Sequence, residues 1–238
     1  MWRDRTKATA NDSAPPDGVD PEFGGQNPLE SDDPGVWNRL VESVGPASLL
    51  LVIDSRLGPM LRGKLNAEDV LQDALLHAWR DRASCAWTDL GGFRAWLLGI
   101  IDHRLLDARD YYSAQKRRVD REQPIQRALP GLGTWRDEPI RTTTPSRLAM
   151  HREQAEVMRA SLENVPSDWR DVVRLRLFEG KSVTQVASEL GIGDSAAKHR
   201  YRKGIDCYRR ALHRHLRTRN TAAWDPQSRN AGIEPRDS

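Results

Sequence analysis

Apolar residues recur at intervals of three and four along two long stretches of the chain, residues 37–114 and 146–217. This spacing is typical of amphipathic α-helices, and strand-like alternation is weak throughout. Between the two stretches, residues 115–145 contain several Pro and Gly residues and little periodicity, which is typical of a linker. The pattern therefore predicts an all-α fold of two small helical domains joined by a flexible linker.

The ends of the chain differ from these stretches in composition. Residues 1–36 hold eight acidic residues, are rich in Pro and Gly, and have almost no apolar periodicity. Such a segment cannot bury enough apolar surface to offset the entropy cost of ordering. We therefore expect a disordered acidic tail there, and a second tail at residues 218–238.

The first stretch contains two clear helix patterns. In one, Asn66 is a suitable N-cap, and the apolar stripe that follows consists of Val70, Leu71, Ala74, Leu75 and Ala78. The polar side of this helix comprises Glu68, Gln72, Asp73, His77 and Arg80. In the other, which follows Gly91 and Gly92, the apolar stripe comprises Phe93, Trp96, Leu97, Ile100, Ile101, Leu105, Ala108 and Tyr112. We expect this second helix to have a basic outer surface.

The second stretch predicts a helix-turn-helix. Ser182 and Gln185 have the spacing of a capping box for a short helix, and Gly191 with Gly193 marks a tight turn after it. A long helix follows, and its buried stripe consists of Ala197, Tyr201, Ile205, Tyr208 and Leu212. A short helix, a turn with Gly and a basic second helix are typical of this DNA-binding motif.

Positive charge is concentrated on this long helix. Residues 198–219 carry nine Lys and Arg against one acidic residue, although the formal net charge of the chain is only +3. With Tyr201 facing the core, helical geometry turns five side chains outward or to the flank: Ser195, Lys198, His199, Arg202 and Lys203. Arg and Lys can bond guanine edges, while Lys198 and Arg200 neutralise phosphates. A solvated face on a terminal helix fits the same pattern, so both interpretations stay open.

Residues 67–80 resemble the polymerase-binding helix of bacterial sigma factors, and residues 93–97 resemble the start of their promoter-melting helix. The order and spacing of residues 162–203 are similar to the minus-35-binding domain of the same family. The linker leaves no room for the intermediate domain of housekeeping sigma factors, so the resemblance is to the extracytoplasmic-function (ECF) subfamily. It implies a protein that binds RNA polymerase core and directs initiation by recognising a minus-35 duplex and melting a minus-10 element.

The resemblance also implies roles for individual residues. The surface that docks on the clamp helices of the largest polymerase subunit matches Asp69, Gln72, Asp73 and Leu76, and the second domain would meet the polymerase flap. An acidic face suits a basic partner, although periodicity alone favours a solvated helix face for these residues. The loop at residues 81–92 lies where the family captures a flipped minus-10 base, and Trp87 and Thr88 are the candidates there.

Two sets of basic residues complete the implied DNA contacts. Near the minus-10 element the backbone contacts would come from Arg104, Arg109, Lys116, Arg117 and Arg118. Toward the minus-35 element the contacts would come from Lys198, His199, Arg200, Arg202 and Lys203. The chain departs from many relatives in opening the recognition helix with Ser195-Ala196-Ala197, and Gly204 interrupts this helix at a cost of about 1 kcal/mol relative to Ala. A promoter sequence therefore cannot be transferred from a relative.

The sequence gives little support for an enzyme. The closest pairs of candidate ligands, His103 with Asp107 and His213 with His215, lack a third ligand or an adjacent nucleophile. There is no Gly-rich phosphate loop. We therefore expect no catalytic residue, no metal and no cofactor.

Two rival functions use the same helices. A stand-alone helix-turn-helix regulator would bind duplex DNA tightly by itself, whereas a sigma factor would bind free DNA weakly. A polymerase-binding antagonist would retain only the first domain's role, and the intact basic helix argues against it. Whether an anti-sigma factor is a further partner stays open.

The amino terminus is polar and lacks the features of a secretion signal. The longest apolar run, residues 47–53, is far shorter than the ~20 residues that span a bilayer. Cys85 and Cys207 are isolated thiols, which fits a reducing compartment, and we assign them no role. The sequence therefore predicts a cytoplasmic protein without membrane association.

Overall fold

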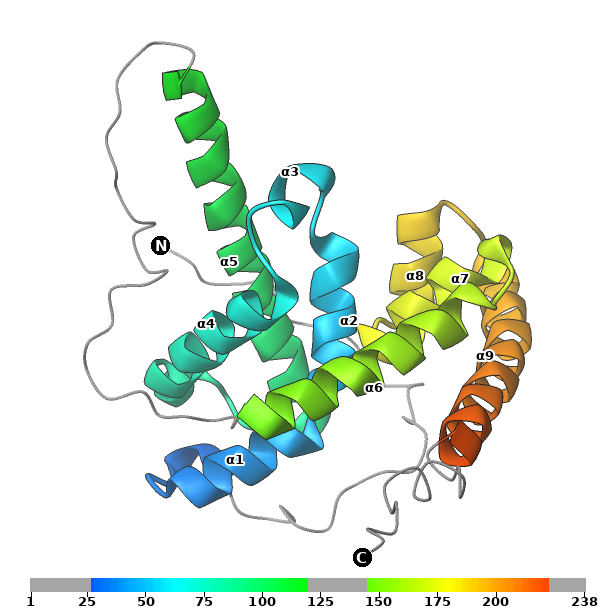
Figure 1. Cartoon of the computed structure of the whole chain (residues 1–238), viewed down its shortest axis with the longest axis horizontal. Coiled ribbons are helices and arrows are strands. Elements are labelled where there is room, and N and C mark those ends of the chain that lie inside the picture. Colours follow the sequence, from blue (N-terminus) through cyan, green and yellow to red (C-terminus); the bar gives the residue numbers. More distant parts are fainter. Residues whose placement is uncertain (1–26, 120–144, 223–238) are drawn as a thin grey trace, which may run out of the picture.

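The computed structural model describes residues 27–119 and 145–222, and within these ranges the chain is helical without strands, which confirms the all-α prediction (Figure 1). The α-helices are α1 (Pro34–Ser43), α2 (Pro46–Arg56), α3 (Pro59–Arg62), α4 (Ala67–Arg80), α5 (Leu90–Val119), α6 (Pro145–Glu163), α7 (Ser167–Val173), α8 (Val183–Leu190) and α9 (Asp194–Ala222). Shorter turns are η2 (Pro28–Glu30), η3 (Arg82–Ser84) and η4 (Arg174–Phe178), the last of them a π-helical turn.

Helix α2 is the centre of the first block of helices. Its residues 49–53 are all buried, and Gly45, at φ 74°, allows the sharp bend that separates it from α1. Trp37 of α1 packs edge-on against Trp79 of α4 and Phe93 of α5, with ring centroids 5.2 and 5.9 Å apart. Within the described ranges no single helix is long and apolar enough to cross a membrane, although the bent pair α1 and α2 meets that test by length and composition.

The prediction of a disordered tail is wrong for residues 27–36. Leu29 is buried in η2, and α1 already begins at Pro34. The side chains of Asn27 and Asp33 cap these two turns, and each cap is followed directly by a Pro. Pro is favourable at the first position of a helix, so these residues start helical turns instead of preventing them. The rest of the expected tail, residues 1–26, lies outside the described residues.

The helices that carry the candidate residues begin largely where the sequence predicts. The Asn66 side chain accepts a hydrogen bond from the Asp69 backbone N–H at 2.7 Å, and Ser182 and Gln185 form the predicted capping box. Helix α5, however, begins at Leu90, so the Gly pair lies inside its first turn. Helices α5 and α9 continue to Val119 and Ala222, beyond the expected limits at residues 114 and 217.

Helix α9 crosses α7 very closely at Gly204. A Cβ atom on Gly204 would lie 2.5 Å from Cγ2 of Val173 and 3.1 Å from Cβ of Trp169. The glycine therefore has a packing role that outweighs its low helix propensity. From the sequence alone, this residue could be interpreted only as an interruption of the helix.

The two blocks of helices pack on one another. Helix α6 lies across α2, and buried residues of both blocks form one continuous hydrophobic cluster (Figure 1). A smaller separate cluster, formed by Val172, Leu175 and Val186, lies inside the second block. Most of the expected linker, residues 120–144, lies outside the described residues. The structure thus shows two helical blocks joined by a shared core as well as by the chain.

Candidate functional site

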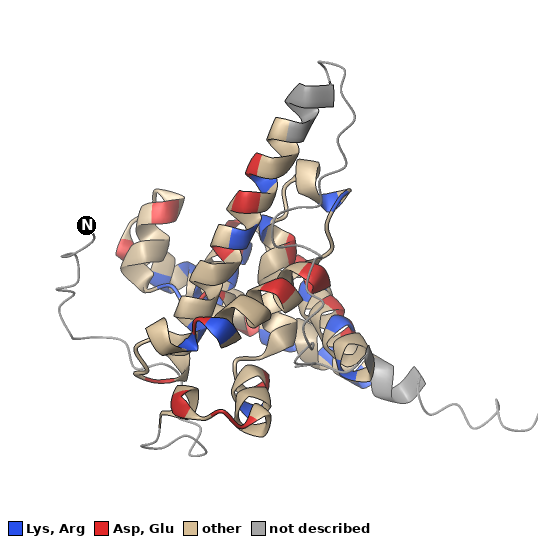
Figure 2. Ribbon diagram, turned by 90° about the vertical axis from the view of Figure 1, so that its left-hand side faces the viewer, with Lys and Arg blue, Asp and Glu red and all other residues tan. Residues whose placement is uncertain are grey.

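The outer face of α9 is basic and exposed, as the periodicity predicted. The exposed residues include Ser195, Lys198, His199, Arg202 and Lys203, and Lys and Arg recur along the helix as far as Arg217. Figure 2 shows Lys and Arg in blue and Asp and Glu in red along the ribbon of the described helices. On the opposite side, Ala197, Ile205 and Tyr208 are buried. Burial raises the pKa of Tyr208 to about 12, so its hydroxyl stays neutral in the core. The helix is anchored by one face and leaves the other accessible to an anionic partner.

The turn before α9 holds this face in place. Gly191 ends α8 in the left-handed conformation with φ 63°, which favours glycine. The guanidinium of Arg176 lies over the Tyr201 ring, 5.5 Å from its centroid, and donates to the Lys181 carbonyl. Arg200 is half-buried, so it is less accessible than Lys198, His199, Arg202 and Lys203 on the outer face. The helix, turn and helix have the order that the sequence predicted.

The polar side of α4 divides into an exposed and a buried part. Asp69 and Gln72 are exposed, and Leu76 is half-buried. Asp73, which we expected on the same free surface, is only 9 % exposed. Its position one turn after Val70 and next to Ala74 places it at the edge of the apolar stripe, where α5 covers it. The prediction of an exposed Asp73 is therefore wrong.

Asp73 belongs to a small cluster between α4 and α5. Its carboxylate lies 3.7 Å from His77 Nε2 and 4.0 Å from an Arg104 guanidinium nitrogen. Burial raises the pKa of Asp73 above its ordinary value, although the charges of His77 and Arg104 oppose this effect. Arg104 also donates to Asp107 at 2.7 Å. Arg104 is thus committed to partners within the chain and only partly available to DNA.

The remaining candidates for minus-10 contacts differ in accessibility. Arg109 is exposed and lies 3.7 Å from Asp110. Trp87 is half-buried, with its ring 6.4 Å from that of Phe93, whereas Thr88 is exposed. A Cβ atom on Gly92 would collide with the Thr88 hydroxyl, so a larger residue there would displace the Thr88 side chain. The side chains of Lys116, Arg117 and Arg118 lie outside the described residues.

A groove of about 790 Å³ lies between α2, α4 and α6. Charges of both signs line it: Asp54, Glu68, Glu156 and Glu163 with Arg62, Arg152, Arg159 and Arg174. Burial alone raises the pKa of Glu68, but the hydrogen bond and charge of Arg152 outweigh it and hold the pKa below its ordinary value. For Asp54 burial dominates, and its pKa is raised despite Arg159. Two ion pairs in this groove, Arg152 with Glu68 and Arg159 with Asp54, join the two blocks.

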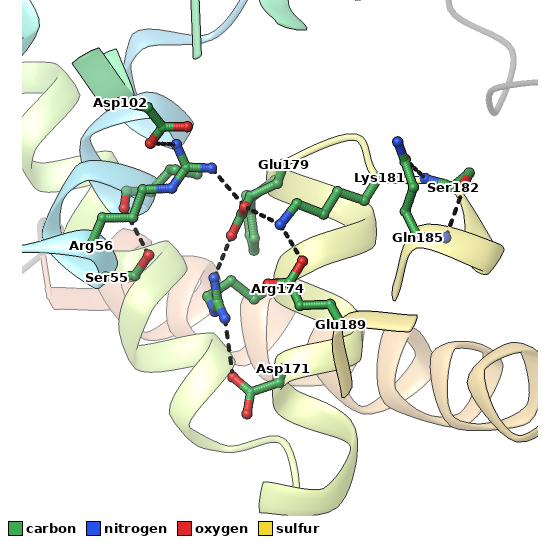
Figure 3. A network of polar contacts seen from close by, with 12 residues as sticks. Ser55, Arg56, Asp102, Asp171, Arg174, Glu179, Lys181, Ser182, Gln185 and Glu189 are labelled. Carbon is green, nitrogen blue, oxygen red and sulfur yellow. Dashed lines mark hydrogen bonds and ion pairs between the residues drawn. The ribbon is translucent and has the colours of Figure 1, made fainter. Parts of the chain in front are cut away.

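A buried network around Glu179 was missed from the sequence (Figure 3). The Glu179 side chain is 2 % exposed and accepts from Arg56 of α2 at 2.7 Å. Arg174 and Lys181 of the second block complete its set of cations. Arg56 and Glu179 are 123 residues apart in the sequence, so no local pattern indicates their pairing.

In the described part of the chain, no group of three or more His, Cys, Asp or Glu residues lies close enough together to hold a metal ion. Cys85 is buried and burial raises the pKa of its thiol, while Cys207 is half-buried beside Arg210. Cys85 belongs to the large hydrophobic cluster, and Cys207 packs against it.

Comparison with known proteins supports the first block as a recognised unit. Residues 54–118 match the family described as Sigma-70 region 2, and these residues include α4 and nearly all of α5. The chain is also similar to the ECF RNA polymerase sigma factor SigX of Bacillus subtilis (strain 168). The two are 24% identical over 161 residues, which cover 64% of this chain and 74% of that protein. The similarity extends well beyond region 2.

Proposed function

Since this chain is an ECF-type sigma factor that directs transcription initiation, we propose a division of labour among its surfaces. In this proposal α4 binds RNA polymerase core, α5 and the loop before it engage the minus-10 element, and α9 engages the minus-35 element. One observation carries it: the chain that matches region 2 also presents a long helix with one buried face and one exposed basic face.

The polymerase contact is supported by the exposed part of α4. Asp69 and Gln72 are accessible to a partner, and the half-buried Leu76 offers an apolar edge beside them. An acidic surface of this kind favours a basic partner such as the clamp helices of the largest subunit. Asp73 contributes indirectly in this proposal, because it fixes α4 on α5 through His77 and Arg104.

The minus-10 contact combines a loop with the basic side of α5. Thr88 is accessible to an extruded base, and Trp87, held against Phe93, forms the wall behind it. Arg109 meets the DNA backbone directly, while Arg104 does so only after losing an internal partner. Residues 116–118 extend the same basic surface in sequence. Contacts of this type weaken as salt rises.

The minus-35 contact is made by the exposed residues of α9. In this proposal the exposed Arg202 and Lys203 reach base edges, and Lys198 with Arg200 neutralises phosphates. His199 supplies a further donor on the same face. The second block would dock near the polymerase flap, so α9 is presented to duplex DNA only within the holoenzyme.

The experiment measures the affinity of the purified chain for bacterial RNA polymerase core. Asp69→Arg reverses an exposed charge on α4 without opening the core, so we expect binding to weaken by at least about tenfold, or ~1.4 kcal/mol. Asp168→Arg is the matched control, because it makes the same change at an exposed residue of α7. Equal affinities of the two variants would reject α4 as the polymerase-binding surface.

A further inference from the structure

Arg176 connects the three elements of the helix-turn-helix region. It belongs to the π-helical turn η4, which continues α7. Its Nη1 atom donates to the backbone carbonyl of Lys181, directly before the Ser182 N-cap of α8, at 2.5 Å. The same guanidinium lies over the Tyr201 ring of α9, 5.5 Å from its centroid. One side chain of η4 therefore contacts both the start of α8 and the buried side of α9.

The π-helical turn gives Arg176 this position. Hydrogen bonds in such a turn span five residues instead of four, and the Glu179 N–H accordingly donates to the Arg174 carbonyl at 3.3 Å. Leu175 and Phe178 fill the core, at 0 % and 4 % exposed, while Arg176 between them is half-buried. Single π turns are frequent at functional sites. This one directs a cation at α9 from between two core residues.

The contact has a cost for stability. The Nε atom of Arg176 is buried, and no hydrogen-bond acceptor lies near it in the described part of the chain. A buried donor without an acceptor destabilises a folded protein, and an apolar side chain of similar length would avoid that cost. A cation over an aromatic ring contributes only modestly where water has access. Arg176 thus fits the placement of α9 better than the stabilisation of the core.

Tyr201 lies at the edge of the basic face of α9. It directly precedes Arg202 and follows Lys198 by three residues, so both of these exposed side chains are its neighbours on the helix. Rotation of α9 by about 10° would move side-chain atoms about 6 Å from its axis by about 1 Å. Paired hydrogen bonds to a base edge require both donors in place. A small rotation therefore affects base preference more than general affinity for DNA.

The other close contact of α9 restrains this rotation weakly. Where α9 crosses α7, Val173 occupies the space that a Cβ atom on Gly204 would need. This crossing fixes the distance between the two helices, but glycine has no side chain that interlocks with its neighbours. The contact of Arg176 with Tyr201, one helical turn earlier, supplies the missing restraint.

We propose that Arg176 is a positioning residue for promoter recognition: through Tyr201 it sets the rotation of α9 and thereby the base preference in the minus-35 element. This inference rests on the proposed function, because it takes α9 as the helix that contacts that element. Arg176 itself contacts no base. Its loss weakens discrimination between promoters and leaves binding to polymerase core unchanged.

Two half-buried arginines of the second block provide the test and its control. Arg176→Met removes the cation over Tyr201, whereas Arg170→Met removes one that donates to the Glu163 and Val165 carbonyls around the turn between α6 and α7. Holoenzyme is bound to promoter DNA from a start site that the chain directs, and to the same DNA with single substitutions in the minus-35 element. The ratio of the two dissociation constants measures base preference.

We expect Arg176→Met to lower this ratio about tenfold at the most discriminating base pair, and Arg170→Met to change it by less than about twofold. The melting temperature should fall no further for Arg176→Met than for Arg170→Met, because the methionine also removes a buried unpaired N–H. A direct phosphate contact of Arg176 would instead weaken binding equally on all sequences and reduce the salt dependence. A larger fall in melting temperature, a uniform loss of binding or an unchanged ratio would each overturn the proposal.

Variants of Tyr201 test the same contact from α9. Tyr201→Phe keeps the ring beneath the guanidinium and should hold the ratio within about twofold, whereas Tyr201→Leu removes the ring and should lower the ratio about tenfold. Adding Arg176→Met to Tyr201→Leu should cause no further loss, because both substitutions remove one shared contact. Additive losses would contradict the proposal.

Failure of the positioning role can be distinguished from failure of the proposed function. If the unaltered holoenzyme shows no preference within the minus-35 element, the proposed role of α9 is wrong. If the unaltered holoenzyme shows a preference and Arg176→Met retains it, only the positioning role of Arg176 is rejected.

Discussion

The first block of helices has a hydrophobic core of its own, whereas the second depends partly on its neighbour. Leu49, Ile53 and Leu75 are at most 1 % exposed and lie around α2 within the first block. The separate core of the second block consists of only Val172, Leu175 and Val186 as buried members. Its other buried residues join the cluster shared with the first block. We call the first block the platform, because it has the larger core of its own and the second block completes part of its core against it.

Removal of one large side chain from each core should cause the largest loss of stability among the variants considered. We expect Leu75→Ala to lower the free energy of unfolding by about 2–5 kcal/mol and to weaken polymerase binding, because it leaves a cavity in the platform. Leu175→Ala, equally buried in the smaller core, should cost near the lower end, about 2 kcal/mol, because a small cluster collapses more easily. Denaturant unfolding measures both costs. Equal loss of polymerase binding in the two variants would contradict the comparison.

A methyl group added where α7 and α9 cross tests the packing of the second block alone. We expect Gly204→Ala to destabilise the protein by about 1–3 kcal/mol, because the new methyl group would collide with Val173. Gly99→Ala in α5 is the control, since nothing lies within 4 Å of the position that its methyl group would take, and Ala should stabilise that helix by about 0.5–1 kcal/mol. Thermal unfolding shows whether each substitution raises or lowers the stability of the protein. Stabilisation by both substitutions would show that Gly204 has no packing role.

Loss of one basic side chain from the outer face of α9 should affect promoter choice and leave the platform intact. We expect Arg202→Ala to weaken promoter-specific binding by the holoenzyme by about 1–3 kcal/mol and to relax base preference in the minus-35 element. Arg214→Ala, an exposed residue later on the same helix, serves as the control. Comparable losses with both variants would assign the effect to net charge instead of a specific contact.

Acid should weaken the contact between the blocks by less than these substitutions change stability or binding. Burial is the largest single effect on Glu179 and raises its pKa, but Arg56, Arg174 and Lys181 together hold the pKa below the ordinary value of 4.5. The stabilisation by Glu179 is therefore complete above about pH 4.5 and declines as the pH falls through the lower folded-state pKa. The stability difference between the unaltered chain and Glu179→Gln should shrink in this window. Because Asp54 and Asp73 have raised pKa values and respond with the opposite sign, only this difference is diagnostic.

The sequence predicted the elements whose signals are local. Asn66 and the Ser182–Gln185 pair marked helix starts, and the stripe through Ala197 and Ile205 set the rotation of α9. Errors arose where a residue lay at a boundary, as with Asp73 at the edge of an apolar stripe.

Contacts between distant segments gave no sequence signal. The pairing of Arg56 with Glu179 and the close approach at Gly204 depend on how helices cross, and helix crossing depends on the whole core. The same limit explains why two separate domains were expected, whereas the structure joins the blocks through α2 and α6.

Reconstituted transcription tests the central claim most directly. The chain is mixed with bacterial core polymerase and genomic DNA of the bacterium that encodes it, and transcript start sites are mapped with and without the chain. We expect new starts that share a minus-35 and a minus-10 element, together with weak duplex binding by the chain alone. Tight, sequence-specific duplex binding by the free chain with no new start sites would contradict the sigma-factor function and identify a stand-alone regulator.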